Sequence, residues 1–302
     1  MAADLEKSVL VYDVGGSHVS AAVCLRGTYR LGHVVNAPHP AEQSSDAFFK
    51  VLYTLGTQAS AGLDGIAGAE LAMPGPFDFD HGVSLMRHKL PYLYGVNLRQ
   101  PLAHHFGCHA GQVRFLLDSA AFLLGEIGAG GARGVPRAVG ITLGTGIGSA
   151  FAVDGQIVTE GPGVAPGGEI WDLPFESGIV EDALSTRGVQ RNYQRRTGVL
   201  LDVARIAAAA GEDPDAAAAF SEFGHDLGLA MRMVLSEFAP QVVVLGGGIS
   251  RSAHLFLPAA QEHLEDLNFR LLTSELKDDA PLVGAGMAWF HGSNSLLLSG
   301  HR

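Results

Sequence analysis

Cysteine is scarce in this chain, and the scarcity limits the chemistry that the chain can support. The 302 residues include two cysteines, Cys24 and Cys108. At most one disulfide can form, so a disulfide-rich secreted scaffold is excluded. Low cysteine content favours a reducing compartment, and we expect a cytoplasmic protein.

Basic residues are few compared with acidic ones. The sequence has 20 Lys and Arg against 31 Asp and Glu, which gives a formal net charge of −11. Because nucleic-acid binding needs a basic surface, nucleic acid is not expected as a main partner. A nucleotide is still allowed as a ligand, since backbone amides and a metal ion can hold its phosphates.

A leader sequence and a membrane-spanning run are not apparent either. The N-terminus reads MAADLEKSVL and lacks the basic and apolar regions of a signal peptide. The uncharged run over 138–153 is rich in glycine and too short to cross a bilayer. We therefore expect no membrane association. Hydrophobic residues make up 47% of the chain and charged residues 17%, so a sizeable core can be buried.

Predicted strands and helices alternate along the chain, which indicates the α/β class. The predicted strands are apolar runs that end in glycines or turn signals, and they lie over 9–24, 66–73, 112–117, 137–158 and 241–246. The predicted helices lie over 46–61, 118 to about 128, about 180–238 and about 282–292.

One pattern occurs twice. VLVYDVGGSHVSAAV (9–23) and VGITLGTGIGSAFAV (139–153) each contain an apolar run, a glycine turn, then Ser, Ala and a second apolar run. Two such units predict a duplicated domain. Chance similarity between two glycine-rich hairpins is the alternative.

The two glycine turns are candidate phosphate-binding loops, because glycine lets backbone amides approach a ligand closely. A P-loop is excluded, since no G-x-x-x-x-G-K-[ST] motif is present, and strand–turn–strand is the wrong context for a dinucleotide-binding fold. Asp13, before the first turn, could hold Mg²⁺ through water. Purely structural hairpins are the alternative. The candidate ATP-binding residues are Asp13, Gly15, Gly16, Ser17, Gly144, Thr145 and Gly146.

Asp118 lies between a buried strand and a helix. Phosphoryl transfer to a sugar hydroxyl needs a positioned carboxylate to accept the hydroxyl proton, and Asp118 is a candidate for this general base. A helix N-cap is the structural alternative for the same residue. The two roles are compatible.

Six motifs in this order resemble the ROK family of sugar kinases and repressors over about residues 9–289: DVGGSHVSAAV, PGPFD, LLDSAAFLLGE, LGTGIGSAFAVDG, VVVLGGGIS and PLVGAGMAW. The resemblance implies a duplicated actin-like ATPase fold, related to ribonuclease H, with two lobes and a central cleft. The chain begins at the first phosphate motif, without the DNA-binding helices of ROK repressors, so it resembles the kinases.

The resemblance also implies an activity and an organisation. It implies ATP-dependent phosphorylation of a hexose, glucokinase-like at O6, with Asp118 as the general base and with ATP and Mg²⁺ as cofactors. We expect an N-terminal lobe over 1–117 and a C-terminal lobe over 118–302, with the last helix packing back on the first lobe. Family members commonly pair through the second lobe, which implies a homodimer.

The sugar site implied by the resemblance departs from the family pattern. The residue before the catalytic aspartate is usually Asn and is Leu117 here. A G-E-x-G-H motif is usual where this chain has Glu169 and, at the histidine position, Asp172. The Cys-rich run that binds zinc in many members is missing, so we predict no zinc site. The candidate sugar-binding residues are Gly75, Asp118, Glu169, Asp172 and Glu181.

Two further segments have competing interpretations. Gly247 and Gly248 follow a buried strand and suit adenine or ribose binding, or a tight strand–helix turn. The segment AHHFGCH has several potential metal ligands, but its spacing fits no zinc motif, and we expect a helix end there.

Other functions stay open from the sequence alone. The departures at Leu117 and Asp172 allow a non-catalytic sugar sensor on a kinase scaffold. Fructose, mannose or an N-acetylhexosamine could replace glucose as the substrate. Polyphosphate could replace ATP, although the sequence has no conspicuous basic track for it.

Overall fold

The computed structural model describes residues 8–63, 65–292 and 297–298, and these form two compact units. Unit 1 takes its described residues from Met1–Arg133 and Asp278–Leu296, and unit 2 from Gly134–Lys277 and Leu297–Arg302. The division follows Arg133 and differs from the boundary expected after Leu117. The reason is that α4 (Asp118–Ala129) packs on α10 (Ala280–His291) within unit 1.

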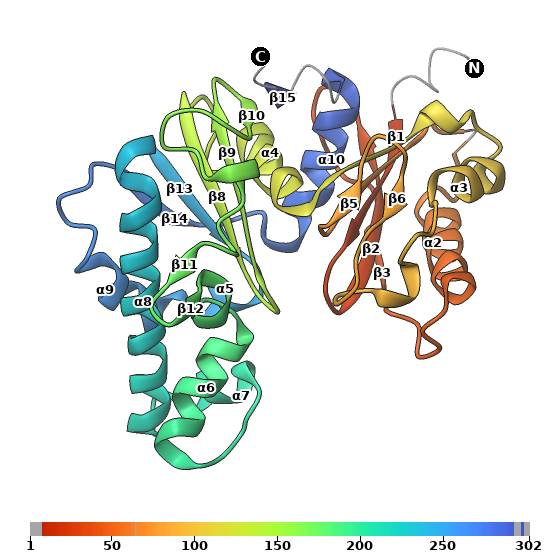
Figure 1. Ribbon diagram of the computed structural model, residues 1–302. Coiled ribbons are helices and arrows are strands. Elements are labelled where there is room, and N and C mark those ends of the chain that lie inside the picture. Colours follow the sequence, from red (N-terminus) through yellow and green to blue (C-terminus); the bar gives the residue numbers. More distant parts are fainter. Residues whose placement is uncertain (1–7, 64, 293–296, 299–302) are drawn as a thin grey trace. The chain divides into compact units, whose positions relative to one another are not determined.

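Unit 1 is built on a five-stranded sheet with the order β3-β2-β1-β4-β7 (Figure 1). Its strands are β1 (Ser8–Val14), β2 (His18–Leu25), β3 (Val35–Pro38), β4 (Ala69–Met73) and β7 (Val113–Leu117). The first three strands are antiparallel neighbours, and β4 and β7 then run parallel to β1. A small hairpin, β5 (Phe77–Asp78) and β6 (Val83–Ser84), follows β4.

Unit 2 repeats this plan in a sheet with the order β14-β13-β8-β9-β10-β15. Its strands are β8 (Arg137–Leu143), β9 (Ile147–Val153), β10 (Gln156–Val158), β13 (Val242–Gly246), β14 (Arg270–Thr273) and β15 (Leu297–Leu298). β8, β9 and β10 are antiparallel neighbours, and β13 and β14 run parallel to β8. The duplication predicted from the two fifteen-residue repeats is therefore confirmed by strand order and strand direction.

The central strand β1 is buried on both faces, as its nearly continuous apolar run predicts. Leu10, Tyr12 and Val14 pack into a core with β4 and β7. Val9 and Val11 belong to a second cluster that includes residues of α10. Because side chains alternate along a strand, Asp13 continues the face of Val9 and Val11.

Helices cover both faces of the unit 1 sheet. The helices α2 (Ser45–Ala59) and α3 (Arg99–Phe106) contribute buried residues to the core around Leu10 and Tyr12. Ser44 caps α2 by accepting a hydrogen bond from the amide of Ala47, and α3 ends at a left-handed Gly107.

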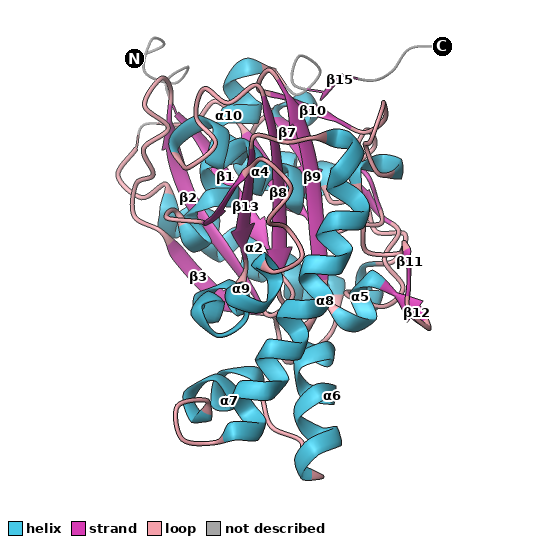
Figure 2. Ribbon diagram, turned by 90° about the vertical axis from the view of Figure 1, so that its left-hand side faces the viewer, coloured by secondary structure: helices cyan, strands magenta, loops and turns pink. Residues whose placement is uncertain are grey.

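Unit 2 has a longer helical part. The expected helical stretch over 180–238 consists of α5 (Val180–Ala183), α6 (Thr186–Thr197), α7 (Val203–Ala209) and α8 (Pro214–Phe238). In Figure 2, α6 and α7 lie beside the first turns of α8. The sequence analysis missed α9 (Ala253–Gln261), which has a proline inside it, and the short strand β14. A hairpin, β11 (Pro174–Phe175) and β12 (Gly178–Ile179), precedes α5.

Glycines bring α4 and α10 into very close contact. A Cβ atom built on Gly125 of α4 would lie 2.0 Å from the carbonyl oxygen of Ala280, and one on Gly284 of α10 would lie 1.8 Å from that of Ala121. Both distances are shorter than any van der Waals contact. The backbones can therefore approach each other only because these side chains are absent.

None of the helices in the described part of the chain is both long enough and apolar enough to cross a membrane.

We predict that Gly125→Ala destabilises the protein, although alanine is normally favoured in a helix by about 1 kcal/mol. The added methyl group would meet the backbone of Ala280, which cannot move aside without displacing α10. The expected loss is about 2 kcal/mol or more in the free energy of unfolding, measured by urea denaturation.

Gly128→Ala in the same helix is the matched control. A Cβ at Gly128 would lie 3.1 Å from the sulfur of Met287, a flexible side chain that can shift. Its expected effect is within about 0.5 kcal/mol. Equal effects of the two variants would contradict the close-packing explanation.

Candidate functional site

The carboxyl ends of neighbouring parallel strands bring the polar residues of unit 1 together. Asp13 lies beside Ala72 in the pairing of β1 with β4, and β4 is paired with β7 as far as Leu117. Asp118 directly follows β7, and Gly75 lies just beyond β4. Three of the predicted site residues of unit 1, Asp13, Gly75 and Asp118, therefore lie at one edge of the sheet, where α/β proteins commonly bind ligands.

Asp118 is partly buried at the start of α4. One carboxylate oxygen accepts a hydrogen bond of 2.7 Å from the amide of Ser119. Burial raises the pKa of Asp118, while the positive charge of Lys89 and the hydrogen bond from Ser119 lower it. A raised pKa makes a carboxylate a stronger base near neutral pH. Leu117 occupies the N-cap position of α4, so Asp118 itself is not the cap residue.

Asp13 lies in a more strongly acidic environment. Burial, and to a smaller extent the negative charges of Asp118 and Asp278, raise the pKa of Asp13 to about 7. Asp278 belongs to the short 3₁₀ helix Lys277–Asp279, directly before α10. Asp118 and Asp278 thus both act by charge on Asp13 at the edge of the unit 1 sheet.

This set of donors fits a divalent cation. A positive charge would relieve the repulsion around Asp13, and carboxylate oxygens are the ligands that Mg²⁺ prefers. Within residues 8–63, 65–292 and 297–298, no three His, Cys, Asp or Glu side chains are grouped closely enough to chelate a metal. A Mg²⁺ ion near Asp13 would therefore depend on water and on a ligand's phosphates for its other contacts.

The loop between β1 and β2 is held in place by its own backbone and by one histidine. The amide of Gly15 donates to the carbonyl oxygen of His18 over 3.0 Å. The ring atom Nε2 of His39 lies 2.8 Å from the carbonyl oxygen of Gly15. Gly16 and Ser17 are exposed at the tip. The loop thus presents the backbone of its tip to solvent, as a phosphate-binding loop requires.

The corresponding turn of unit 2 is fixed by α6. The amide of Gly144 donates to the carbonyl oxygen of Gly146 over 2.9 Å. The amide and hydroxyl of Thr186, at the start of α6, both donate to the carbonyl oxygen of Gly144. Thr145 is exposed at the tip of the turn.

The glycines after β13 lie against the end of β8. Gly247 has a left-handed backbone, with φ of 81°, and a Cβ there would lie 2.4 Å from the carbonyl oxygen of Leu143. Gly247 and Gly248 are both exposed. Since Leu143 directly precedes the turn 144–146, the structure brings together the unit 2 residues that were predicted to bind the nucleotide.

Glu181 lies closer to the glycine turn than its predicted role as a sugar ligand suggests. Its carboxylate accepts a hydrogen bond of 3.3 Å from the amide of Ile147, and a Cβ on Gly146 would come within 2.3 Å of it. Arg187 forms an ion pair of 3.2 Å with the same carboxylate. Glu181 therefore borders the candidate phosphate loop of unit 2.

Glu169 and Asp172 lie in an adjoining loop. The hydroxyl of Ser149 donates to the carbonyl oxygen of Gly168 and accepts the amide of Ile170, which fixes the loop on β9. The amide of Glu181 donates to the carbonyl oxygen of Trp171 over 2.9 Å. This bond places the loop containing Glu169 and Asp172 next to the start of α5.

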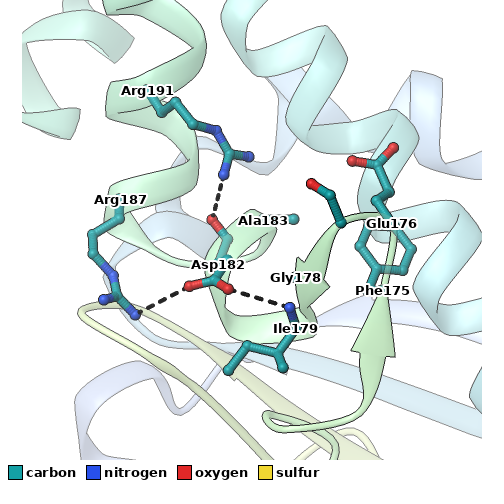
Figure 3. Close-up of a pocket in the computed structure, with 9 residues that line it drawn as sticks. Phe175, Glu176, Gly178, Ile179, Asp182, Ala183, Arg187 and Arg191 are labelled. Carbon is teal, nitrogen blue, oxygen red and sulfur yellow. Dashed lines mark hydrogen bonds and ion pairs between the residues drawn. The ribbon is translucent and has the colours of Figure 1, made fainter.

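A pocket of about 310 Å³ lies beneath the β11–β12 hairpin in unit 2. Figure 3 shows Arg187 and Arg191 pointing from α6 toward Asp182. One Asp182 oxygen accepts the amide of Ile179 over 3.2 Å, and the Asp182 backbone oxygen accepts Arg191. Asp182, which belongs to α5, therefore forms hydrogen bonds with both β12 and α6.

Several residues of the site were not predicted from the sequence. Lys89 and Asp278 act on the carboxylates through charge, and neither belongs to a motif with an obvious spacing. Asp278 could have been noticed because it lies three residues before the start of PLVGAGMAW. His39 and Thr186 hold the loops through contacts that only the fold creates.

The segment AHHFGCH lies at the end of α3, as expected. The ring of His105 stacks on Tyr53 with 3.9 Å between ring centroids, and the amide of Cys108 donates to the carbonyl oxygen of Ala103. The histidine thus has a packing role.

Comparisons with known proteins agree with this geometry. The model of the ROK family matches residues 9–292. A glucokinase of Thermotoga maritima is 26% identical over 247 residues, 71% of this chain and 76% of that protein. An N-acetyl-D-glucosamine kinase of Yersinia enterocolitica is 25% identical over 264 residues, 81% of this chain and 85% of that protein.

The fold matches a solved structure over nearly its whole length. A ROK family glucokinase from Streptomyces griseus, in complex with glucose and AMPPNP, superposes with a TM-score of 0.78 at 21% identity. The match covers 92% of this chain and 97% of that one. The chain thus has the duplicated actin-like ATPase fold that the motifs implied.

The acidic cluster predicts how stability depends on pH. The folded-state pKa of Asp13, about 7, lies above its ordinary value of 3.8. The folded chain therefore keeps a proton that the unfolded chain releases, and stability falls as the pH rises through this window. Asp13→Asn should thus be more stable than the parent at pH 8 by on the order of 1–3 kcal/mol, and by less at pH 5.

Urea denaturation at both pH values, with and without Mg²⁺, measures this difference. Mg²⁺ should stabilise the parent at pH 8 and leave Asp13→Asn unchanged. Asp80→Asn, at an exposed loop carboxylate, is the control and should have no effect. A gain for Asp13→Asn that is the same at both pH values would contradict the charge explanation.

Proposed function

Because the chain belongs to the ROK family, we propose that it is a sugar kinase that transfers the terminal phosphoryl group of ATP to a hydroxyl of a hexose. Its relatives include proteins named glucokinase and N-acetyl-D-glucosamine kinase, both of which phosphorylate a sugar. Glucose, phosphorylated at O6, is the first candidate substrate.

The observation that carries this proposal is the grouping of Asp13, Asp118 and Asp278 at the carboxyl edge of one sheet. A buried carboxyl group whose pKa is raised by burial and by two neighbouring carboxylates, as at Asp13, destabilises a fold, so a purely structural role does not account for it. A kinase needs two carboxylates at its site, one to accept the hydroxyl proton and one to hold a cation.

Asp118 serves as the general base in this proposal. It would accept the proton of the attacking hydroxyl as the new bond to phosphorus forms. Its hydrogen bond from Ser119 fixes the orientation of the carboxylate, and burial keeps its pKa raised. Lys89 lowers the pKa, so the two effects together set the pH at which the base becomes active.

The nucleotide would be bound mainly by backbone. The candidates to donate amides or hydroxyls to phosphate oxygens are the exposed Gly16 and Ser17 in unit 1, and the exposed Thr145 and half-buried Gly146 in unit 2. The exposed Gly247 and Gly248 would leave room for the ribose or the adenine. A bound Mg²⁺, held by Asp13 through water, would neutralise phosphate charge.

The sugar would be bound by carboxylates and one glycine loop. Glu169, Asp172 and Glu181 would accept hydrogen bonds from sugar hydroxyls, and Gly75 would allow close approach beside Asp118. Leu117 offers no hydrogen bond next to the base. The loss of one donor there should weaken discrimination among sugars that differ at a single hydroxyl.

A sugar sensor without turnover is the second candidate. It is favoured by the ion pair between Glu181 and Arg187, which already occupies a carboxylate that a kinase would use for the sugar. An assay of ADP release over hexoses and N-acetylhexosamines separates the two. Sugar binding without ADP release from any of them would favour the sensor.

Asp118→Asn should reduce turnover by 10²-fold or more, because the amide cannot accept the hydroxyl proton. Sugar affinity and the unfolding midpoint should change little, since asparagine has the same shape. ADP release, calorimetric sugar titration and urea denaturation measure the three quantities. Turnover close to that of the parent would assign the base to another residue.

Removing Lys89 should shift the pH profile of the reaction. Lys89 lowers the pKa of Asp118, so Lys89→Met should raise that pKa and move the acid limb of the kcat/KM profile to higher pH. Lys50→Met on α2 replaces an exposed lysine in the same unit and should leave the profile in place. A shift to lower pH would rule out this role for Lys89.

A further inference from the structure

The two candidate phosphate turns are held in the same way by side chains from outside their hairpins. In each turn, the carbonyl oxygen of the first residue accepts a hydrogen bond from a side chain of another segment. In unit 1, the ring atom Nε2 of His39, directly after β3, lies 2.8 Å from the Gly15 oxygen. In unit 2, the hydroxyl of Thr186 lies 2.9 Å from the Gly144 oxygen. We call His39 and Thr186 the anchors.

Holding a carbonyl oxygen also fixes the direction of the next amide. A trans peptide unit is planar, and its C=O and N–H groups point in opposite directions. With the carbonyl of Gly15 turned toward His39, the amide of Gly16 points away from that ring, and the amide of Thr145 points away from α6 in the same manner. Gly16 and Thr145 are exposed, and neither amide donates a hydrogen bond to the described residues. Both amides can therefore donate to a ligand.

The surroundings of His39 confine its polar role to this contact. Its ring is nearly parallel to that of Phe48 on α2, with 6.1 Å between ring centroids. Because a carbonyl oxygen can only accept, Nε2 carries the ring proton. The other ring nitrogen, Nδ1, is buried and has no hydrogen-bond partner in the described part of the chain. Phenylalanine would pack on Phe48 without burying an unpartnered nitrogen, so packing alone does not explain a histidine here.

The anchor of unit 2 supplies two donors from one residue. Thr186 is the first residue of α6, and its amide donates to the Gly144 oxygen over 2.7 Å in addition to its hydroxyl. Amides of the first helical turn have no partner within the helix, so this one is free for the contact. Loss of the hydroxyl would leave the amide in place. We therefore expect the unit 2 turn to depend less on its anchoring side chain than the unit 1 turn does.

We propose that His39 and Thr186 are positioning residues that direct the amides of Gly16 and Thr145 toward the phosphate oxygens of a nucleoside triphosphate. This inference rests on the proposed function, because it assigns how the same site binds its nucleotide. Amides that already point outward lose little conformational freedom when phosphate binds, which raises affinity. The anchors hold the turns only, so sugar affinity does not depend on them.

Nucleotide titration of unit 1 variants tests the first anchor. His39→Phe keeps an aromatic ring beside Phe48 and removes the donor, so the Kd for AMPPNP with Mg²⁺ should rise about 10-fold in calorimetry. His39→Gln carries an amide nitrogen near the position of Nε2 and should stay within about 2-fold of the parent. His33→Phe, at an exposed histidine before β3, is the control and should leave the Kd unchanged. An affinity of His39→Phe equal to that of the parent would overturn the role of His39.

Thr186→Val gives a second test that does not depend on the folding of the His39 variants. Valine keeps the shape and the amide but lacks the hydroxyl, so the Kd for AMPPNP should rise about 3-fold, and Thr186→Ser should restore it. Glucose affinity measured without nucleotide should match the parent in all these variants. A loss of glucose affinity as large as the loss for AMPPNP would overturn the proposal, because it would indicate a general disturbance of the fold.

The proposed function and the anchors fail in different ways. Weaker AMPPNP binding in His39→Phe and Thr186→Val, without ADP release by the parent from any sugar, would support the anchors and contradict the kinase. ADP release with an unchanged KM for ATP in both variants would support the kinase and overturn the anchors. A parent that binds no AMPPNP would also overturn them.

Discussion

The repulsion of the buried Asp13 carboxyl group by two neighbouring carboxylates is the constraint on which the unit 1 site depends. Asp13 carries a pKa of about 7 because burial and two acidic neighbours disfavour its charge. Without a cation this arrangement costs stability, which natural proteins accept mainly at sites where the charge has a use. The same repulsion would favour the Mg²⁺ ion proposed here, because a divalent ion would remove the cost.

The sheet maintains this repulsion by fixing where each carboxylate lies. β1 and β7 both flank β4 and run parallel to it, so Asp13 and Asp118 emerge at one edge. α4 starts at Asp118, and its contact with α10 is closed by Gly125 and Gly284. Since Asp278 belongs to the short 3₁₀ helix directly before α10, the close helix contact also holds the third carboxylate at this edge.

The sequence alone was enough to predict the duplicated unit and the order of strand and helix around Asp118. The repeat 9–23 and 139–153 predicted the duplication, and the apolar run before Asp118 predicted a strand followed by a helix; both are confirmed. The contributions of Lys89 and Asp278 could not be predicted, because they act through space from loops with no regular spacing. The break at Arg133 was missed for a similar reason: only the packing of α4 on α10 assigns that helix to unit 1.

The residues proposed for the reaction and those proposed for substrate choice lie in different kinds of structure. The residues proposed for the reaction lie at strand ends, where a one-residue shift would change every pairing in the sheet. Glu169 and Asp172 lie in a turn held by Ser149 and by a single bond from Glu181. A turn can exchange its central side chains without altering the strands beneath it. The departure from the family pattern at Asp172 can therefore change which sugar binds while the proposed base at Asp118 keeps its geometry.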